Sequence, residues 1–509
     1  MKLRNLVEAV KELLNDENEV LAEEILDTEI TALVSDSRVK IEKGNAFVCI
    51  EGTKTDGHTF AAEAEKNGAA VIFAQKKVEL TGSARLLLVN DSRKAISLLS
   101  AAWFDYPAQK LKTIGITGTK GKSTTCYMIS NILKAAGHKV GIIGTIGVSV
   151  GDKMYDTNNT TPDPYLIQKY IREMVDNGCD TMVMEVSSQG LKQDRVYGIE
   201  YDYAALTNIG HDHIGGLEHK DFAEYLYCKS LLFRQCKTAV VNAQDEHLED
   251  IIRGAGCRLE GFASSPEFDH GRVLFTSVFT AENICLYSAN AETGVMFNYN
   301  SYPETVKGTV KLLIPGRFNV MNAMCAIAVC RHFDVDEQAI ADGLMNTFVL
   351  GRLEPVKISD RFTILIDYAH NAMALESVLK TLREYKPKRL VCLFGCGGDR
   401  SKDRRFEMGE VSSKMADLTV VTSDNPRTEK PEDIIADIMT GVKRADGEYI
   451  MIVDRREAIR YVIENAQQGD VILLAGKGNE TYQEINGVKH HMDEREIIHD
   501  VVEALGGKV

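Results

Sequence analysis

The stretch TIGITGTKGKSTT at residues 113–125 decides how this chain folds. It begins as an apolar strand, turns through glycines and ends in Lys-Ser-Thr at the start of a helix. Backbone N–H groups in such a turn and at the helix N-terminus face an anion, and glycines let it approach closely. Lys122 adds a positive charge, and the Ser123 hydroxyl is placed to ligate the magnesium that accompanies a nucleotide. The stretch therefore predicts a nucleotide-binding loop in an α/β sheet.

The glycine spacing departs from the common phosphate-binding pattern G-x-x-x-x-G-K-[ST]. Ile116 stands where that pattern has its first glycine, and the spacing here is G-x-x-G-x-x-G-K-S. A glycine-rich turn that binds no nucleotide is the alternative interpretation. The order of strand, Gly-Lys-Ser-Thr and helix argues against it.

Length and composition limit the possible classes of protein. A chain of 509 residues predicts about three domains. The net charge of −15 argues against a nucleic-acid partner, and no apolar run reaches the roughly 18 residues of a membrane span. The eleven cysteines are scattered without paired C-x-x-C motifs, which favours reduced thiols over disulfides or zinc. We expect a monomeric cytoplasmic protein with no membrane insertion.

The pattern of elements predicts three α/β domains. Residues 1–110 read as a small α/β domain, and residues 111–348 as a parallel-sheet domain that carries the phosphate loop and a β-rich part near 260–315. Residues 349–509 read as a doubly wound, Rossmann-like domain with five apolar strands, at 362–366, 390–394, 418–422, 449–453 and 471–474.

Four polar residues in the central domain are candidates for chemistry. Glu185 ends an apolar strand, where a carboxylate can hold magnesium beside the phosphate loop, although a strand-terminal acid can also face water. His211 and His213 follow another strand and are equally well explained as solvated loop residues. Lys229 falls on the apolar face of a helix; the pattern alone favours a lysine whose ammonium reaches water over a buried, reactive amine.

Polar clusters follow all five strands of the last domain. In a parallel sheet they share one edge, which is the usual ligand-binding edge. Arginines mixed with carboxylates there suit a small zwitterionic substrate with carboxylate groups, because arginine can hold a carboxylate by two parallel hydrogen bonds. The five clusters lie at 367–370, 395–400, 424–427, 454–456 and 476–480.

Several of these motifs, spread over essentially the whole chain, resemble those of the Mur ligases. The most similar type is MurE, which adds an amino acid to UDP-N-acetylmuramoyl-L-alanyl-D-glutamate during peptidoglycan synthesis. Mur ligases also depart from the strict phosphate-loop pattern. The motifs that carry the resemblance are Gly-Thr-Lys-Gly-Lys-Ser-Thr at 118–124, Asn-Thr-Thr-Pro-Asp at 159–163, Glu-Val-Ser-Ser at 185–188, Gly-Cys-Gly-Gly-Asp-Arg at 395–400, Asp-Asn-Pro-Arg at 424–427 and Gly-Lys-Gly at 476–478.

The resemblance implies an ATP- and Mg²⁺-dependent, ADP-forming ligase whose first domain binds the UDP-sugar. The implied ATP-binding residues are Gly118, Thr119, Lys120, Gly121, Lys122, Ser123, Thr124, Asn319, Asn322, Arg352, Asp367 and His370. The implied catalytic residues are Lys122, Glu185, His213 and Lys229, and the implied magnesium ligands are Ser123, Glu185, His213 and a carbamylated Lys229. The resemblance thus reverses the interpretation of Lys229 from pattern alone.

The same resemblance implies two further sets of substrate contacts. The UDP end would be held by Ser35, Ser37, Thr53, Lys54 and Thr55, and the muramoyl-peptide part by Asn159, Thr160, Thr161, Ser187, Gln193 and Arg195. The added amino acid would be held by Arg405, Asp424, Asn425, Pro426, Arg427, Gly476 and Glu480. The Asp-Asn-Pro-Arg motif favours meso-diaminopimelate, with L-lysine as the alternative.

The chain also departs from the family pattern in four places. Gln189, His211, the segment 371–373 and Asn479 replace residues that are common in the family. The departures leave open a related ligase with another acceptor, or a catalytically silent scaffold that binds the nucleotide sugar. A plain ATPase or kinase module is a third alternative, but it leaves the five polar clusters unexplained.

Overall fold

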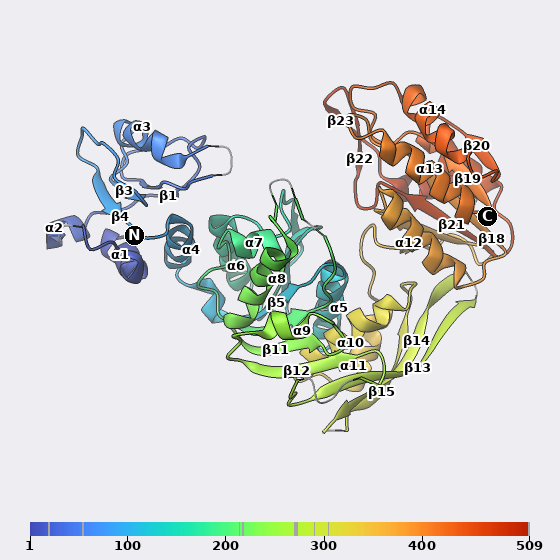
Figure 1. The fold of residues 1–509 in the computed structure, drawn as a ribbon, viewed down its shortest axis with the longest axis horizontal. Helices are drawn as coiled ribbons and strands as arrows, with labels where there is room; N and C mark the ends of the chain where they lie inside the picture. The colour runs from blue at the N-terminus through green and yellow to red at the C-terminus, as the bar shows by residue number, and fades with distance from the viewer. Residues whose placement is uncertain are drawn as a thin grey trace. The chain divides into compact units, whose positions relative to one another are not determined.

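The computed structural model describes residues 1–18, 21–52, 55–212, 214–215, 218–268, 273–289, 291–303 and 305–506. They form two compact units. Figure 1 shows the ribbon coloured from the N-terminus to the C-terminus. Unit 1 comprises Met1–Phe262, Phe268–Val278 and Cys325–Asp334; unit 2 comprises Ala263–Glu267, Phe279–Met324 and Val335–Val509. In the described part of the chain, no helix combines the length and the apolar character needed to cross a membrane.

Unit 1 begins with a small parallel sheet in the order β1-β2-β3-β4. Apolar side chains of α1 and α4 pack on one face of this sheet and those of α3 on the other. The Asp91 carboxylate caps α4 by accepting hydrogen bonds from the N–H groups of Arg93 and Lys94. The elements are α1 (Leu3–Ala9), η1 (Lys11–Leu13), α2 (Glu23–Leu26), β1 (Leu33–Val34), β2 (Ala46–Val48), η2 (Gly57–Phe60), α3 (Ala61–Lys66), β3 (Val71–Ala74), β4 (Arg85–Leu88), α4 (Ser92–Trp103) and η3 (Pro107–Lys110).

The rest of unit 1 is a larger sheet in the order β12-β11-β10-β5-β9-β6-β7-β8. The strands from β12 to β6 are parallel, and β7 and β8 extend the sheet in antiparallel fashion. The elements are β5 (Lys112–Thr117), α5 (Lys122–Ala135), β6 (Val140–Gly144), β7 (Gly147–Val150), β8 (Lys153–Tyr155), α6 (Pro164–Asp176), β9 (Thr181–Glu185), α7 (Ser188–Lys192), β10 (Tyr201–Leu206), α8 (Phe222–Ser230), η4 (Leu231–Arg234), β11 (Cys236–Asn242), α9 (Leu248–Ile252) and β12 (Arg258–Ala263).

The phosphate-loop strand lies inside this sheet, as its composition predicts. β5 pairs with β9 on one side and with β10 on the other, and all but the first of its residues are buried. A strand covered on both faces needs a continuous apolar run rather than an alternating one. The loops that follow β5, β9 and β10 therefore leave the same edge of the sheet.

Unit 2 contains the predicted doubly wound sheet, in the order β16-β17-β21-β18-β19-β20. β16 is antiparallel to β17, and the other pairs are parallel. The five predicted strands are confirmed as β17, β18, β19, β20 and β21, although β20 ends at Met451. Apolar side chains of α15 and α16 cover one face of the sheet, and α12, α13 and α14 lie along the other (Figure 1).

The predicted β-rich part is confirmed as well. In unit 2, β14 lies between β13 and β15, and it pairs with β15 in antiparallel register from Val295↔Leu312 to Asn300↔Lys307. The elements of unit 2 are β13 (Val278–Ala289), β14 (Glu292–Tyr302), β15 (Lys307–Leu312), α10 (Phe318–Cys330, of which the residues from Cys325 belong to unit 1), α11 (Glu337–Met345), β16 (Glu354–Val356), β17 (Thr363–Asp367), α12 (Ala372–Arg383), β18 (Arg389–Phe394), α13 (Asp403–Met415), β19 (Leu418–Val421), α14 (Pro431–Val442), β20 (Tyr449–Met451), α15 (Arg455–Glu464), β21 (Asp470–Ala475), β22 (Tyr482–Ile485), β23 (Val488–His491) and α16 (Glu494–Ala504).

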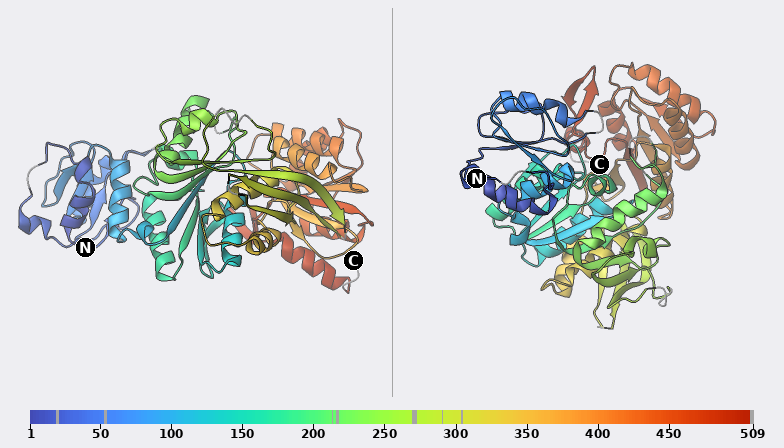
Figure 2. Two further views of the ribbon diagram at one scale, coloured as in Figure 1. Left: turned by 90° about the horizontal axis from the view of Figure 1, so that it is seen from below. Right: turned by 60° about the vertical axis from the view of Figure 1, so that its left-hand side comes forward.

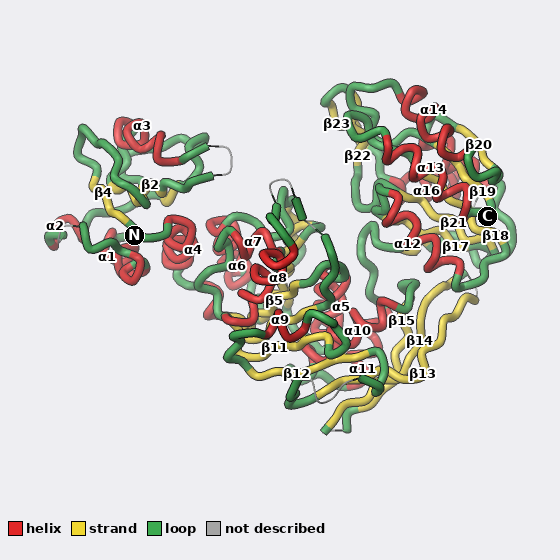
Figure 3. The backbone as a smooth tube through the Cα atoms, viewed as in Figure 1, coloured by secondary structure: helices red, strands yellow, loops and turns green. Residues whose placement is uncertain are grey.

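Strands and helices alternate along much of both units, whereas β6 to β8 and β12 to β15 follow one another without an intervening helix. Figure 2 shows the ribbon from two further directions, and Figure 3 distinguishes the helices in red from the strands in yellow. In such sheets the loops at the carboxyl ends of the strands are where ligands bind. The polar residues predicted from the sequence are concentrated in these loops.

Candidate active site

The loop between β5 and α5 has a backbone shape that glycine makes possible. Gly118 has φ +148°, and a Cβ at this position would lie 1.9 Å from Thr207 Oγ1. Gly121 precedes α5 with φ +84°. The loop after β10 holds this shape, since the Thr119 N–H donates to Asn208 O at 2.8 Å and the Lys120 N–H donates to Asn208 Oδ1 at 3.0 Å.

Two lysines converge on one carbonyl of this loop. Lys122 Nζ donates to Gly118 O at 2.9 Å and to Thr119 O at 3.2 Å. Lys229 Nζ donates to Gly118 O at 2.8 Å and lies 3.4 Å from Thr117 Oγ1. Both ammonium groups therefore lie at the start of the phosphate loop.

The Lys229 side chain is buried. Only 1% of the residue is exposed, so the prediction from pattern alone, that its ammonium reaches water, is wrong. Burial lowers the pKa of Lys229 well below its usual value, and the nearby charge of Lys122 lowers it further. Burial lowers the pKa of Lys122 too, while the Glu185 carboxylate acts in the opposite direction. The Lys229 amine is thereby held toward its neutral form.

Glu185 is a buried carboxylate with a fixed orientation. It ends β9 and is 1% exposed, and its two oxygens accept hydrogen bonds from the Thr145 N–H at 2.9 Å and the Thr145 hydroxyl at 3.1 Å. A Cβ on Gly144 would lie 2.3 Å from Glu185 Oε1, so glycine leaves the space that the carboxylate occupies. The interpretation of Glu185 as an acid facing water is therefore wrong.

The donors available to a metal ion are few. Across the described ranges, no group of three or more His, Cys, Asp or Glu side chains is arranged to hold one. One fixed carboxylate and a hydroxyl fit the way magnesium binds beside nucleotide phosphates, with few protein ligands and several water or phosphate oxygens. Glu185 and Ser123, the second residue of α5, supply these two groups. The predicted ligand His213 lies outside the described residues.

Four of the six residues predicted for the muramoyl peptide, Thr161, Ser187, Gln193 and Arg195, form one hydrogen-bonded group. The Thr161 hydroxyl donates to Glu185 O at 2.9 Å and accepts from the Ser187 N–H at 2.9 Å. Arg195 donates to Thr161 O at 2.6 Å and to Gln193 Oε1 at 2.8 Å. These contacts join the loop after β8 to α7, next to Glu185.

Two residues of this region were not predicted from the sequence. Thr145, besides holding Glu185, places its hydroxyl 3.0 Å from Thr160 Oγ1 and so connects the carboxylate to the 159–161 loop. The Tyr225 hydroxyl lies 2.8 Å from Thr119 Oγ1, and the Tyr225 ring lies 4.7 Å from Lys229 Nζ. Tyr225 precedes Lys229 by four residues, which is a helical spacing that could have indicated the contact.

Two of the departures from the family pattern also lie here. Gln189 is in α7, where its Nε2 is buried without a hydrogen-bond partner among the described residues. The His211 ring stacks on Phe222 with their centroids 4.0 Å apart. Neither side chain is among the hydrogen-bond partners of Lys122, Glu185 or Lys229.

The residues predicted for the UDP end lie in loops of the small sheet. Ser35 and Ser37 follow β1, and Thr55 lies just before η2, whereas Thr53 and Lys54 lie outside the described residues. In the same part of unit 1 there is a cavity of about 410 Å³, which the sequence did not indicate. It is lined by Glu51, Gly52, Gln75, Asp91, Ser92 and Arg93.

The residues predicted for adenosine lie in two places in unit 2. Asn322 Nδ2 donates to Asn319 Oδ1 at 2.9 Å, and both residues are buried near the start of α10. At the end of β17, the Asp367 carboxylate accepts from the N–H groups of Leu353 and Ala369, each at 2.8 Å. Burial raises the pKa of Asp367, and the charge of Arg352 opposes this shift.

Tyr368 connects two more of these adenosine residues. The Arg352 guanidinium lies 5.2 Å from the Tyr368 ring. His370 Nδ1 lies 2.8 Å from Tyr368 O, and the two rings meet edge to face. Arg352, Asp367 and His370 therefore lie together at the end of β17.

Two arginines near the carboxyl edge of the sheet in unit 2, Arg405 and Arg427, are already paired with protein groups. Arg405 is 1% exposed and donates to Glu429 at 2.6 Å and to Asp437 at 2.9 Å. Arg427 has φ +53°, and its guanidinium donates to Gly398 O at 2.7 Å and to Glu484 at 3.1 Å. The Arg427 side chain is 23% exposed, whereas Arg405 is enclosed.

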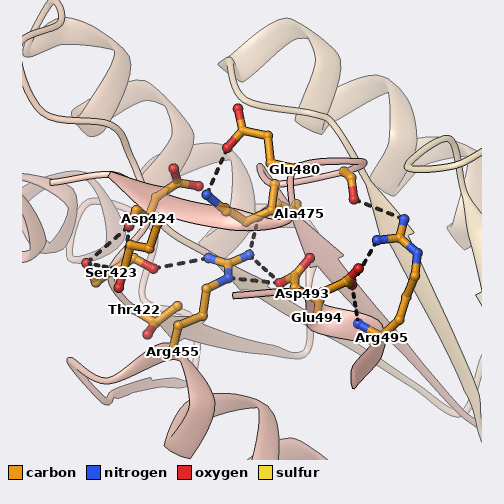
Figure 4. Close-up of polar contacts among 12 residues, drawn as sticks. Thr422, Ser423, Asp424, Arg455, Ala475, Glu480, Asp493, Glu494 and Arg495 are labelled. Carbon is orange, nitrogen blue, oxygen red and sulfur yellow. Dashed lines mark hydrogen bonds and ion pairs between the residues drawn. The ribbon is translucent and has the colours of Figure 1, made fainter. Parts of the chain in front are cut away.

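Arg455 lies beneath this edge rather than on it. The residue is 2% exposed and donates to Ser423 O at 3.3 Å, to Ala475 O at 3.0 Å and to Glu494 at 2.8–2.9 Å (Figure 4). It thus joins the loop after β19 to the end of β21. The adjacent Arg456 is exposed and pairs with Asp500.

The remaining residues predicted for the amino acid lie in the loops after β19 and β21. A Cβ on Gly476 would lie 2.9 Å from Asp424 Oδ2, and the Asp424 carboxylate accepts from the Asn425 N–H at 2.6 Å. Pro426 approaches the loop after β18 closely, since a Cβ on Gly398 would lie 1.9 Å from Pro426 O. Asn425 and Glu480 are hydrogen-bonded to each other at 2.8 Å.

Comparison with known proteins gives matches to three family models. Residues 29–103 match "Mur ligase family, catalytic domain", residues 116–330 match "Mur ligase middle domain" and residues 351–478 match "Mur ligase, glutamate ligase domain". The predicted domain limits at 110 and 348 fall between these matches and stay predictions.

Relatives with the same overall length match along almost the whole chain. UDP-N-acetylmuramoyl-L-alanyl-D-glutamate--2,6-diaminopimelate ligase 1 of Clostridium acetobutylicum is 39% identical over 94% of this chain and 96% of its own length. The ligase of that name from Syntrophomonas wolfei is 36% identical over 99% of both chains. A solved structure of a UDP-N-acetylmuramoyl-L-alanyl-D-glutamate--2,6-diaminopimelate ligase has a TM-score of 0.71 with 29% identity over 99% of both chains.

Proposed function

The chain belongs to the Mur ligase family, and on that basis we propose that it adds meso-diaminopimelate to UDP-N-acetylmuramoyl-L-alanyl-D-glutamate. The reaction consumes ATP and forms ADP and phosphate. One structural observation carries the proposal: Lys122 and Lys229 meet at the Gly118 carbonyl of a phosphate loop, in the same sheet edge as the fixed carboxylate of Glu185. This arrangement suits transfer of a phosphoryl group.

The proposed chemistry has two steps. A carboxylate of the muramoyl dipeptide attacks the γ-phosphorus of ATP, which gives an acyl phosphate and releases ADP. The amine of the amino acid then attacks the acyl carbon, which gives the amide, releases phosphate and frees a proton. Loop N–H groups and Lys122 stabilise the charge on the transferred phosphoryl group.

Magnesium would be held by Glu185, by the Ser123 hydroxyl and by Lys229 after carbamylation. Bound there, it would neutralise charge on the phosphate oxygens. Carbamylation joins the neutral Lys229 amine to CO₂ and releases a proton, so the amine becomes a carbamate anion. Burial of Lys229 supports this role, because only the neutral amine reacts.

The added amino acid would bind at the carboxyl edge of the sheet in unit 2. We assign its distal carboxylate to Arg427, whose side chain is partly exposed, and its distal ammonium to Glu480. Arg405, which is enclosed by Glu429 and Asp437, would hold the loops around the amino acid rather than touch it. We further propose that the enzyme acts as a monomer in the cytoplasm, which sedimentation and fractionation would test.

A single assay tests the function and its specificity. The protein is incubated with UDP-N-acetylmuramoyl-L-alanyl-D-glutamate, ATP and Mg²⁺, with meso-diaminopimelate, L-lysine or no amine, and phosphate release and product mass are followed. We expect an amide product with meso-diaminopimelate and phosphate release that requires the amine. A product with lysine alone would overturn the specificity, and no product with any amine would overturn the ligase proposal in favour of a silent scaffold.

A further inference from the structure

A buried lysine lies directly beneath the two side chains proposed to contact the added amino acid. Lys477 is 0% exposed and follows β21. Its Nζ donates to Asn425 Oδ1 at 2.8 Å, to Glu480 Oε2 at 2.8 Å and to the carbonyl oxygen of Tyr482. An ammonium has three N–H groups, and all three are used inside the protein. Lys477 therefore has no donor left for a ligand.

The hydrogen bonds of Lys477 fix the direction of the Asn425 amide. Asn425 Oδ1 accepts from Lys477 and also from the Glu484 N–H at 2.9 Å, so this atom is the oxygen. The other end of the amide is then the NH₂ group, and it donates to Glu480 Oε2 at 2.8 Å. Without Lys477, the Asn425 oxygen would keep only the Glu484 N–H as a donor, and the amide orientation would be less strongly fixed.

The same contacts fix Glu480. Its Oε2 accepts from both Lys477 and Asn425, which leaves Oε1 without a hydrogen bond to any described residue. The Glu480 side chain is 20% exposed, so this carboxylate reaches the surface of the site, while the groups that orient it are buried. Figure 4 shows Glu480 beside the loop that carries Asp424.

We propose that Lys477 is a positioning residue that holds Asn425 and Glu480 in the orientation that recognises the distal ammonium of the added amino acid. This inference rests on the proposed function, because it assigns a cause to the specificity of that site. Lys477 acts only through its neighbours. It offers Glu480 one charged partner on Oε2, so that Oε1 can accept from a second ammonium, that of the substrate.

The experiment uses three amino acids that differ at the distal end. meso-Diaminopimelate carries an ammonium and a carboxylate there, L-2-aminopimelate lacks the ammonium, and L-lysine lacks the carboxylate. In Lys477→Met we expect the KM for diaminopimelate to rise about tenfold, the effect of one hydrogen bond to a charged group. The KM for ATP and the kcat should change by less than about threefold, since neither depends on this bond.

The preference of Lys477→Met among the three amino acids distinguishes a positioning role of Lys477 from a general loss of structure. The preference for diaminopimelate over aminopimelate should fall about tenfold in Lys477→Met, because the site no longer binds the distal ammonium specifically. The preference for diaminopimelate over lysine should be retained, because it depends on the distal carboxylate that Arg427 binds. An unchanged preference over aminopimelate, or an equal fall in both preferences, would overturn the inference.

Lys489→Met is the matched control. Lys489 is exposed, and its Nζ lies 4.0 Å from the Tyr482 ring, the same ring that Lys477 approaches at 5.3 Å. The Lys489→Met variant removes a lysine near the same ring. It should leave the preferences for diaminopimelate over aminopimelate and over lysine unchanged. If Lys477→Met does not fold, Lys477→Gln retains two N–H donors without the charge and is held to the same outcomes.

Failure of the proposed function and failure of the inference about Lys477 give different results. Wild-type protein that forms no product with any amine overturns the proposed function and this inference together. Wild-type protein that prefers diaminopimelate over aminopimelate, with the same preference in Lys477→Met, overturns the inference alone.

Discussion

The phosphate loop of unit 1 and the carboxyl edge of the sheet in unit 2 are built by different means. The phosphate loop takes its shape from its backbone: Gly118 and Gly121 adopt positive φ, and lysine side chains bind the loop's own carbonyl groups. The edge in unit 2 takes its shape from buried side chains. Arg405 joins α13 to Glu429 and to α14, and Arg455 joins the loop after β19 to the end of β21. A change in the first should remove activity, and a change in the second should loosen the fold.

The largest expected effect is on the phosphate loop. Lys122→Ala removes the charge nearest the transferred phosphoryl group, so we expect amine-dependent ADP formation to fall about 10³-fold. Only two hydrogen bonds to loop carbonyls are lost, which costs about 1–2 kcal/mol of stability. Coupled-assay rates and thermal unfolding measure the two quantities. Lys134→Ala, which changes an exposed residue in the last turn of the same helix, is the control and should retain full activity.

Beneath the carboxyl edge of the sheet in unit 2, we expect the main effect of a substitution to be a loss of stability. Arg455→Met leaves Glu494 buried without its cation, which costs about 3–5 kcal/mol. We expect backbone amides of β19 and β21 to exchange hydrogen about 10²–10³-fold faster, measured by mass spectrometry. Arg456→Met removes an exposed partner of Asp500 and should cost no more than about 1 kcal/mol. Equal exchange in the two variants would contradict a supporting role for Arg455.

The difference between a loop shaped by its backbone and an edge shaped by buried side chains explains what the sequence could predict. The phosphate loop was predicted correctly because glycine spacing constrains the backbone directly. Strands β5, β9 and β10 of unit 1 and the five strands β17 to β21 of unit 2 were predicted because buried parallel strands need continuous apolar runs, whereas β7, β8 and β11 were not predicted. Whether an arginine faces a ligand or the protein depends on partners far along the chain. Arg455 and Arg456 are adjacent, yet one is buried against Glu494 and the other pairs with Asp500 at the surface.

Lys229 illustrates the limit within a single helix. Its place on an apolar face is more typical of a lysine that reaches water than of a buried one, so the pattern alone gave the wrong prediction. The partners that keep it buried, Thr117 and Gly118, lie more than 100 residues earlier in the chain, so local pattern could not reveal them. Thr145 was missed for the same reason, since its role depends on Glu185 in a neighbouring strand.

A smaller effect is expected from moving Glu185 without replacing it. In Gly144→Ala the new Cβ would lie 2.3 Å from Glu185 Oε1, so the carboxylate must shift. We expect ADP formation to fall about 10–10²-fold, as displacement of a catalytic group by about 1 Å does. The Mg²⁺ concentration for half-maximal rate should rise. Gly256→Ala, where a Cβ meets open space, is the control; a Mg²⁺ requirement equal to that of wild type in Gly144→Ala would argue against metal binding at Glu185.

The smallest expected effect concerns the protonation of Lys229, and it links the two lysines, Lys122 and Lys229, that donate to the Gly118 carbonyl. Burial and the charge of Lys122 lower the pKa of Lys229, so its neutral amine exists at lower pH than that of an ordinary lysine. Protein in ¹³C-bicarbonate should therefore show a carbamate signal by NMR near neutral pH, and the signal should weaken as the pH falls and the amine is protonated. Lys229→Arg should show none.

Lys122→Met tests the contribution of the neighbouring charge to this signal. Without that charge the pKa of Lys229 rises toward its usual value, although burial, the larger cause, still lowers it. The pH at which the carbamate signal reaches half its maximum should therefore move upward, and the signal should persist. A midpoint that does not move would show that the charge of Lys122 contributes nothing to the protonation of Lys229, and burial would remain as the cause that lowers its pKa.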